Sequence, residues 1–218
     1  PRSSTAILLL GTAYEAIGDT KMAIQSLERS LAMGLGVSRS FEVHARLDGI
    51  YSRAGRTRGL EQYDEAALRN PRDAVAIFNQ GKAHFASGNN AEALSKFLGA
   101  YSLGLRTGES VAWLAVTTNQ GGNHVKSDGF IAEAIGLEPE NALVFQFRAD
   151  ILSNRLSFQS AIEDYGTAIG LDPDLVSAYL GRGLAYAQMG LYVLAIEDFT
   201  KAISINPDNS KSHGFRGD

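Results

Sequence analysis

Small residues recur every 34 positions along this chain, and this period constrains the fold more than any other feature of the sequence. Four series of residues keep one register over more than half of the chain. They are Gly81, Ala115, Ala149 and Gly183; Ala93, Ser127, Ala161 and Ala195; Ala100, Ala134, Ala168 and Ala202; and Pro139, Pro173 and Pro207. A fixed period of this length indicates a stack of small supersecondary units, each of which buries its apolar face against the next.

Each period contains two apolar stripes at helical spacing, separated by a short break. In the first period the spacing W-x2-L-G-x2-Y and then A-x3-F is kept by Ile7, Leu10, Gly11, Tyr14, Ala23 and Leu27. In the last full period the corresponding residues are Tyr179, Arg182, Gly183, Tyr186, Ala195, Phe199, Ala202 and Pro207. This pattern resembles the tetratricopeptide repeat, a helix-turn-helix unit, over nearly the whole chain.

The resemblance implies an all-α fold: an α-solenoid of about six repeats and a partial seventh, with about thirteen helices wound into a right-handed superhelix. We expect one solenoid domain over residues 1–218, with repeats that begin near Ser4, Phe41, Ala74, Gly108, Ala142 and Val176. Residues 210–218 match the opening of a seventh repeat. The chain is therefore expected to be a fragment of a longer protein, with a short capping helix as the alternative.

The register slips between the first and second repeats. Gly11 and Asp48 occupy equivalent positions but are 37 residues apart, whereas Asp48 and Gly81 are 33 apart. About three extra residues therefore lie near Gly34. We expect the link between these two repeats to be the least regular part of the solenoid.

The small residues have a packing role in this interpretation. Gly or Ala in each helix lets the paired helix approach, and a large residue four positions later fills the remaining space. We therefore expect buried helix–helix contacts at Leu10, Tyr14, Ala149, Ala195 and Phe199. A second set of glycines suits the left-handed backbone at the end of each first helix. These are Gly18, Gly55, Gly88, Gly122 and Gly190.

Composition sets limits on the class of partner. The net charge of −4 argues weakly against binding to a nucleic-acid backbone. No run of about 18 apolar residues occurs, so no membrane-spanning segment is expected. The absence of cysteine excludes disulfides, thiolate metal sites and a cysteine nucleophile. The chain begins at Pro1, so a leader could have been removed; the compartment stays open, with the cytoplasm slightly favoured.

No set of residues in the sequence suggests catalysis. The histidines lie in different repeats, without a partner at metal-binding helical spacing; they are His44, His84, His124 and His213. Gly181 and Gly183 begin a G-x-G pattern, but they lie inside an expected helix, where packing explains them better. We therefore predict a protein that is not an enzyme and that needs no metal and no cofactor.

In proteins of this kind the first helix of each repeat lines a concave groove that receives a peptide or a partner helix. Aromatic side chains offer large apolar contacts with few rotamers, and amides can bind an extended backbone. The predicted groove residues are Phe78, Asn79, Lys82, Phe85, Trp113, Val116, Asn119, Phe147, Asp150 and Asn154. Packing of Phe78 and Phe147 against a neighbouring repeat is an equally good explanation of those two residues.

Arg46 and Arg53 lie seven residues apart, on one face of the first helix of the second repeat. Two arginines on one face could bind a carboxylate. The alternative is that they pair with Glu42 and Asp48. Leu8 and Thr12 occupy places where a carboxylate clamp of the kind found in chaperone-binding relatives would need Lys and Asn, so a chaperone-tail receptor is disfavoured.

Three classes of function stay open at this stage. The favoured one is a non-catalytic scaffold that binds a peptide or helix of another protein in its groove. The second is self-assembly into a homo-oligomer, in which open ends stack or a neighbouring copy fills the groove. The third is the targeting arm of a larger enzyme whose catalytic part lies outside this chain.

Overall fold

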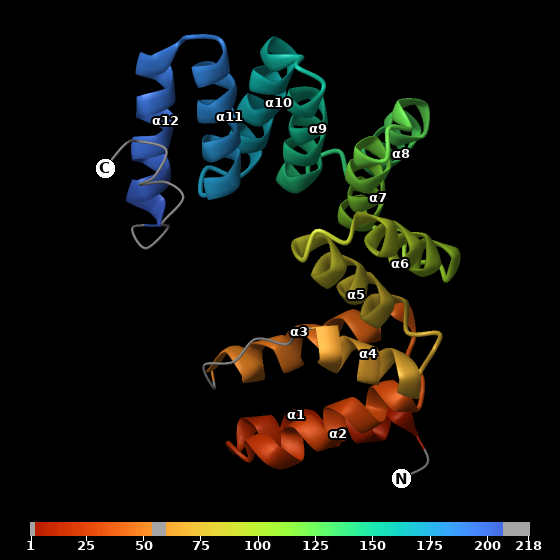
Figure 1. Cartoon of the computed structure of the whole chain (residues 1–218). Coiled ribbons are helices and arrows are strands. Elements are labelled where there is room, and N and C mark those ends of the chain that lie inside the picture. Colours follow the sequence, from red (N-terminus) through yellow and green to blue (C-terminus); the bar gives the residue numbers. More distant parts are fainter. Residues whose placement is uncertain (1–2, 54–59, 207–218) are drawn as a thin grey trace. The chain divides into compact units, whose positions relative to one another are not determined.

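The computed structural model describes residues 3–53 and 60–206, and all regular structure in these ranges is α-helical (Figure 1). The helices are α1 (Ser4–Ala16), α2 (Thr20–Ala32), α3 (Val37–Arg53), α4 (Leu60–Arg69), α5 (Ala74–Ala86), α6 (Asn90–Ser102), α7 (Gly108–Gln120), α8 (His124–Leu137), α9 (Ala142–Asn154), α10 (Phe158–Leu171), α11 (Val176–Gln188) and α12 (Tyr192–Ile205). The predicted all-α helical-repeat fold is confirmed for the described residues. The start of a seventh repeat at 210–218 lies outside them.

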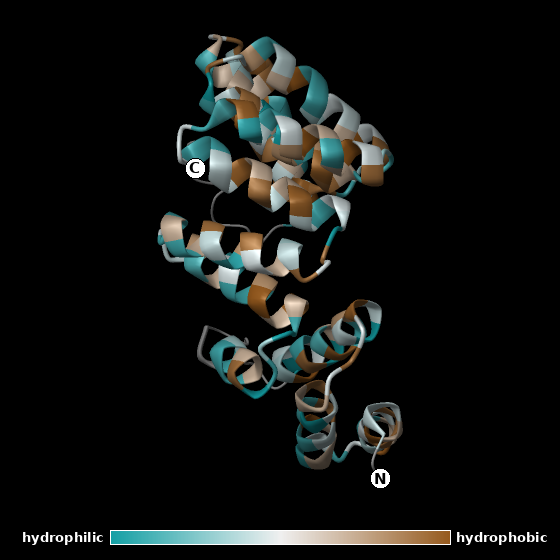
Figure 2. Cartoon of the chain, turned by 90° about the vertical axis from the view of Figure 1, so that its right-hand side faces the viewer, coloured by the Kyte–Doolittle hydropathy of each residue, from teal (hydrophilic) through white to brown (hydrophobic). Residues whose placement is uncertain are grey.

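Consecutive helices pack in pairs, as helix-turn-helix repeats require; α1 packs on α2, α5 on α6, α7 on α8, α9 on α10 and α11 on α12. The chain divides into two compact units, Pro1–Arg106 with α1 to α6 and Thr107–Asp218 with α7 to α12. We call them the N-terminal unit and the C-terminal unit. Each helix carries both hydrophobic and hydrophilic residues, which suits an element packed on one side and solvated on the other (Figure 2).

The first helices of five repeats begin at the residues where the period places them; these are Ser4, Ala74, Gly108, Ala142 and Val176. The second repeat differs, because α3 begins at Val37 instead of Phe41. The extra residues therefore add one turn to the start of α3. The expectation of an irregular link was wrong: residues 33–36 join α2 to α3, and residues 138–141 join α8 to α9 with the same length. A helical turn pairs backbone groups that an irregular insertion would leave to solvent.

The turn inside each repeat needs a residue with positive φ. Gly18, Gly88, Gly122 and Gly190 have φ between 76° and 79°, as the sequence predicts, and Gly55 lies outside the described residues. In the fifth repeat Leu156 takes this position with φ 62°. The left-handed residue lets the chain reverse while the next amide reaches back to the helix; Asp19 N, for example, donates to Tyr14 O at 3.0 Å.

Small residues face large aromatic ones where paired helices meet. A Cβ built on Gly81 would lie 2.5 Å from the Phe97 ring, and one on Gly183 would lie 2.5 Å from the Phe199 ring. Ala149, Ala195 and Phe199 are buried as predicted, and Tyr14 is half-buried. The mutual fit of glycine and aromatic ring sets the helix spacing within a repeat.

The prediction that Leu10 is buried was wrong, since 42% of its surface is exposed. Leu47, the equivalent residue of α3, is fully buried in a cluster with Leu27 and Leu31 of the preceding α2. This position is therefore covered by the second helix of the repeat before it. Among the described residues no helix takes that place beside α1, and Leu10 is exposed.

Candidate functional site

The predicted groove residues lie on first helices in both units. α5 of the N-terminal unit carries Phe78, Asn79, Lys82 and Phe85, and the others lie on α7 and α9 of the C-terminal unit. We call the corresponding sides of these helices the first-helix faces. Each unit has its own first-helix face, and the two are described separately.

On α5, Phe78 belongs to the packing between helices. Its exposed fraction is 1%, and its ring centroid lies 5.4 Å from that of Phe97 on α6. Asn79 is also buried. Lys82 covers the edge of this pair, with Nζ 4.9 Å from the Phe78 ring centroid. Lys82 and Phe85 are half-buried, so of the four residues these two offer the most surface to a ligand.

On α7 and α9, an aromatic contact joins two successive repeats. The rings of Trp113 and Phe147 lie 5.0 Å apart between centroids, at an interplanar angle of 57°. Phe147 and the neighbouring Val116 are buried, whereas Trp113 is half-buried. Packing against a neighbouring repeat, the alternative for Phe78 and Phe147, thus accounts for Phe147. Phe78 instead packs on Phe97 within its own repeat. Trp113 keeps part of its surface and marks the edge of the C-terminal first-helix face.

Asn119 forms hydrogen bonds within the protein. Its Oδ1 accepts from Arg155 Nε at 2.7 Å and lies 2.9 Å from His124 Nδ1. Arg155 also donates from Nη1 to Asp128 at 2.7 Å. The arginine follows α9 and thereby ties the end of that helix to the α7–α8 turn. Sequence reasoning missed Arg155, because nothing in the period assigns a partner to a residue in a turn.

Asp150 is the centre of a chain of polar contacts on α9 to α11. Tyr165 OH donates to Oδ1 at 2.5 Å, and Gln146 Nε2 donates to Oδ2 at 3.3 Å. Gln146 Oε1 in turn accepts from Ser177 Oγ of α11 at 2.5 Å. Burial raises the pKa of Asp150 above its usual value, and the hydrogen bonds from Tyr165 and Gln146 offset only part of this effect.

Asn154 lies one turn beyond Asp150 on the same side of α9. Its Nδ2 donates to the Asp150 carbonyl oxygen at 2.9 Å, and the residue is exposed. Part of the surface of Asp150 is exposed to solvent. Together with Trp113, these two residues are the accessible members of the predicted set in the C-terminal unit.

The two arginines proposed for carboxylate binding do converge on a carboxylate, which belongs to the protein itself. Arg46 Nη1 lies 3.2 Å from Glu15 Oε2, and Arg53 Nη2 lies 2.7 Å from Glu15 Oε1. Arg46 Nε also pairs with Glu42 at 3.1 Å, as the alternative predicted. Asp48 accepts a hydrogen bond from Tyr63 at 3.2 Å. Glu15 therefore already occupies the position that a ligand carboxylate would take between the arginines.

A hollow of about 270 Å³ lies beside this ion pair in the N-terminal unit. It is lined by Glu15, Gly18, Thr20, Ala23, Ile50 and Arg53. Sequence reasoning missed Glu15 as the partner of the arginines. The signal was present in the spacing, since Glu15 precedes Arg46 by 31 residues, close to one period.

The buried His44 has a structural role. Its Nε2 lies 3.1 Å from Asp73 Oδ2, and Ser40 Oγ donates to Asp73 Oδ1 at 2.5 Å. Asp73 also caps α5 by accepting from the amides of Val75 and Ala76. Serine and histidine both bind the carboxylate instead of each other, so no nucleophile is paired with a base. The cluster fixes the start of α5 against α3.

Models of the tetratricopeptide repeat match residues 6–38, 51–107 and 176–209, and a TPR repeat model matches residues 157–190. These segments span more than half of the chain and contain helix pairs that pack as the repeat requires. The chain belongs to the tetratricopeptide repeat family.

Solved tetratricopeptide repeat structures show the same fold at low sequence identity. One from Parabacteroides merdae ATCC 43184 is 16% identical with a TM-score of 0.67, over 100% of this chain and 85% of that one. YrrB, described as a TPR protein with an unusual peptide-binding site, is 17% identical with a TM-score of 0.50. The match covers 98% of this chain and 91% of YrrB. The structure of the APC/C hetero-tetramer Cut9-Hcn1 is 13% identical in sequence, with a TM-score of 0.62. That match covers 99% of this chain and 39% of the other. No curated protein matches the chain in sequence.

Within residues 3–53 and 60–206 of this tetratricopeptide repeat chain, no three acidic or histidine side chains are grouped so as to hold a metal ion. In the same ranges, no helix has both the length and the apolarity needed to cross a bilayer.

Proposed function

We propose that this chain is a non-catalytic scaffold that binds a peptide or a helix of another protein on its first-helix faces. The observation that carries the proposal is the side-by-side packing of α7, α9 and α11. Trp113–Phe147 and Ser177–Gln146 join successive first helices, so they form one surface with aromatic, amide and carboxylate side chains. Rigid surfaces with these groups suit recognition of an extended or helical segment.

The residues that would touch the ligand are a subset of the predicted groove. In the C-terminal unit they are Trp113, Asp150 and Asn154, and in the N-terminal unit they are Lys82 and Phe85. The buried Phe78, Val116, Asn119 and Phe147 would act indirectly, by fixing the positions of the helices that carry these side chains. Peptide binding in YrrB supports this proposal only as a property found within the same fold.

A selection of random 12-residue peptides displayed on phage, with the 218-residue chain as bait, tests the proposal. Selected peptides should bind in solution and change the fluorescence of Trp113, the only tryptophan. For peptides that bind the C-terminal unit, Asn154→Ala should weaken binding, whereas Lys201→Ala on the second helix α12 should not. Failure to select any peptide that binds in solution would overturn the proposal.

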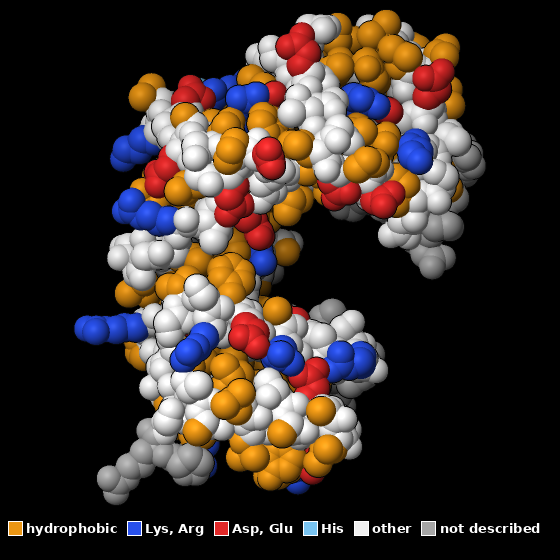
Figure 3. Space-filling view, turned by 180° about the vertical axis from the view of Figure 1, so that it is seen from behind, with side chains coloured by type: hydrophobic (Ala, Val, Ile, Leu, Met, Phe, Trp, Pro, Cys, Tyr) orange, Lys and Arg blue, Asp and Glu red, His pale blue; other side chains and the backbone are white. Residues whose placement is uncertain are grey.

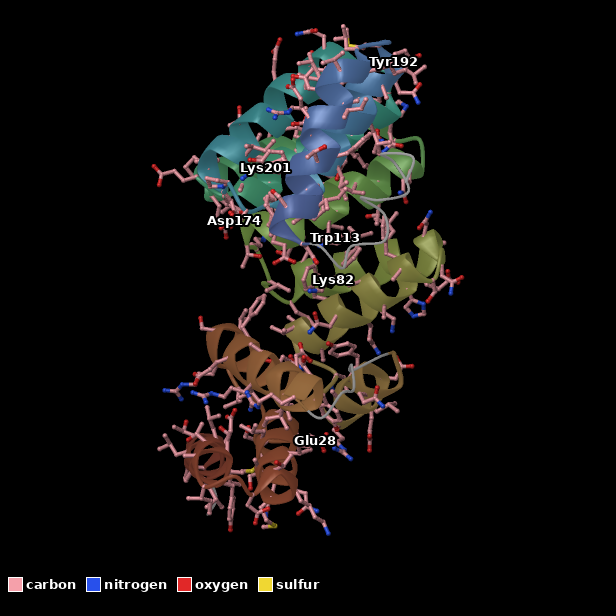
Figure 4. The ribbon with its side chains drawn as sticks, turned by 90° about the vertical axis from the view of Figure 1, so that its left-hand side faces the viewer. Glu28, Lys82, Trp113, Asp174, Tyr192 and Lys201 are labelled. Atoms are coloured by element: carbon pink, nitrogen blue, oxygen red, sulfur yellow. The ribbon has the colours of Figure 1, made fainter. Side chains whose placement is uncertain are left out.

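A second candidate function is self-assembly, which is favoured by apolar side chains exposed on α1 and α12. Leu9 of α1 is 64% exposed, and Tyr192 and Ile196 of α12 are 66% and 51% exposed. Tyr192 is labelled in Figure 4. Exposed apolar patches of this kind mark interaction sites. The α1 surface is the type of face that interior repeats cover with the second helix of the preceding repeat, so α12 of another copy would fit it.

Light scattering across protein concentration tests self-assembly. Leu9→Glu and Ile196→Glu should each abolish association when studied alone. A mixture of the two variants should form dimers, because each variant keeps the face that the other lacks. A chain that stays monomeric at all concentrations, or a mixture that does not associate, would exclude head-to-tail assembly.

A further inference from the structure

The C-terminal unit is acidic, in contrast to the N-terminal unit. Residues 107–218 contain seven Lys and Arg against fourteen Asp and Glu, whereas residues 1–106 contain thirteen against ten. Figure 3 shows acidic side chains spread over one face of the α7–α12 unit. A ligand of the C-terminal unit would therefore meet a negative potential.

The arginines among residues 107–206 are already paired with other acids. Arg148 donates to Asp164 at 2.6 and 2.5 Å, and Arg182 donates to Asp198 at 2.8 and 2.7 Å. Arg155 pairs with Asp128 at 2.7 Å. In that range the lysines are Lys126 and Lys201, which lie on the second helices α8 and α12. No described cation pairs with Asp150, whose polar contacts are with uncharged groups.

Asp150 retains capacity for a further hydrogen-bond donor. An ionised carboxylate offers about four acceptor positions, and Tyr165 and Gln146 use one on each oxygen, the second at the long distance of 3.3 Å. Burial is the main cause of the raised pKa of Asp150, and no described positive charge offsets it. A donor that carries positive charge would supply it.

The hydrogen bond between Ser177 and Gln146 indicates which residues of α11 run along α9 near Asp150. Ser177 of α11 is bonded to Gln146, one turn before Asp150 on α9. Leu180 and Leu184 follow Ser177 on the same side of α11, one and two turns along, so they run alongside Asp150. Leu180 is buried, with 9% of its surface exposed, and Leu184 is 39% exposed. A long aliphatic stem can lie on such residues while its charged end reaches the carboxylate.

Resting on the proposed function, we infer that the α9–α11 part of the C-terminal first-helix face selects peptides with a lysine or arginine, whose cationic end binds Asp150 and whose stem lies on Leu180 and Leu184. Gln146 and Asn154 border the same site and can hydrogen-bond the peptide backbone. Lysine and arginine are both included. The carboxylate of Asp150 requires a positive charge at the end of a long side chain, but nothing in the site requires the two parallel hydrogen bonds that would favour arginine.

The phage selection with the 218-residue chain as bait tests this specificity. Selected peptides should be enriched in Lys or Arg relative to the starting library. The same selection on Asp150→Asn should lose that enrichment, because asparagine keeps an acceptor for Tyr165 but has no charge. Glu163→Gln on α10 is the matched control, since it changes net charge equally on a second helix and should keep the enrichment.

Fluorescence anisotropy with one labelled basic peptide from the selection measures the effect at 150 mM salt. Asp150→Asn should weaken binding roughly tenfold or more, as should replacement of the basic residue by norleucine. The two changes together should cost little more than either alone. Peptides without basic enrichment, or equal weakening by Glu163→Gln, would overturn the inference and leave peptide binding intact. Failure to select any peptide would overturn both proposals.

Discussion

Arg182 of α11 and Asp198 of α12 form a two-pronged ion pair, with Nε–Oδ2 at 2.8 Å and Nη2–Oδ1 at 2.7 Å. The same pair occurs one period earlier as Arg148 and Asp164, with distances of 2.6 and 2.5 Å. Each arginine comes from a first helix and each aspartate from the second helix 16 residues later. The last two repeats therefore share a polar contact, in addition to the small and apolar residues that define the 34-residue period.

Removal of one partner of this pair should destabilise the C-terminal unit. The Asp198 side chain is buried and the Arg182 side chain is half-buried, so an unpaired charge would stay partly desolvated. We expect Asp198→Ala to lower the free energy of unfolding by about 1–3 kcal/mol, measured by urea denaturation. The exposed neighbour Glu197→Ala is the control and should change it by less than about 0.5 kcal/mol. Equal effects would show that the pair has no special role.

The glycine of the first helix should not tolerate even one methyl group. A Cβ at Gly183 would approach Phe199 to 2.5 Å, so the Phe199 ring or the helix must move. Gly183→Ala is expected to lower stability by about 1–3 kcal/mol. Gly129→Ala is the matched control, because nothing lies within 4 Å of that Cβ. It should raise stability by about 0.5–1 kcal/mol through helix propensity, and a stable Gly183→Ala protein would contradict the packing argument.

Leu156 holds a backbone conformation that suits glycine. Its φ is 62°, and 75% of its surface is exposed, so its side chain contributes little burial. Leu156→Gly should therefore raise the melting temperature, with a gain of about 0.5–1 kcal/mol from relief of left-handed strain. The reverse change at an equivalent turn, Gly190→Leu, should destabilise by a similar amount. If both changes destabilise, the Leu156 side chain has a role that its exposure does not reveal.

Asp73 should make the N-terminal unit sensitive to acid. Burial alone would raise the pKa of Asp73. The hydrogen bond and the charge interaction with His44, together with hydrogen bonds from Ser40 and the Ala76 amide, have a larger effect and lower the pKa. A carboxyl with a lowered folded pKa stabilises above its unfolded pKa of about 4 and loses this contribution below it. Asp73→Asn removes the titrating group.

Urea unfolding from pH 7 to pH 3 measures this effect. The stability difference between the native chain and Asp73→Asn should be constant above about pH 5 and shrink toward pH 3. Asp19→Asn is a control, since Asp19 caps α2 through Met22 N at 3.1 Å in an exposed position. A stability difference that does not change between pH 5 and pH 3 would mean that Asp73 titrates alike in the folded and unfolded states.

The period in the sequence predicts the helix pairs because each repeat satisfies the same local requirements. Glycine at the turn and a small residue opposite an aromatic ring depend on neighbours within one repeat, so Gly183 and Phe199 could be assigned from spacing alone. Contacts between repeats were harder to predict. Leu10 keeps the motif but is exposed, whereas the equivalent Leu47 is covered by α2. Arg46 and Arg53 bind Glu15 of the repeat before them.

The candidate site was predicted less well for the same reason. Whether an aromatic residue on a first helix faces a ligand or the next repeat depends on the angle between repeats, which no motif residue specifies. Phe147 therefore packs on Trp113 of the preceding repeat, whereas Trp113 keeps part of its surface exposed. Phe78 packs on Phe97 within its own repeat. Asp150 could be named from its helical position, but its bond to Tyr165 and the lack of a described cation beside it required the structure.

Trp113 should contribute to stability through Phe147 as well as report on ligands. The two rings join α7 to α9 at a centroid distance of 5.0 Å. Trp113→Ala should therefore cost about 2–4 kcal/mol of stability, and a double-mutant cycle with Phe147→Ala should give a coupling of about 0.5–1.5 kcal/mol. Trp113→Phe should keep most of the contact, so it is the better variant for asking whether Trp113 contributes to peptide binding, with anisotropy of a labelled peptide as the readout. Tyr192→Ala at an exposed position is the control for loss of an aromatic ring and should leave stability nearly unchanged. Additive effects of Trp113→Ala and Phe147→Ala would mean that the ring contact does not hold these two repeats together.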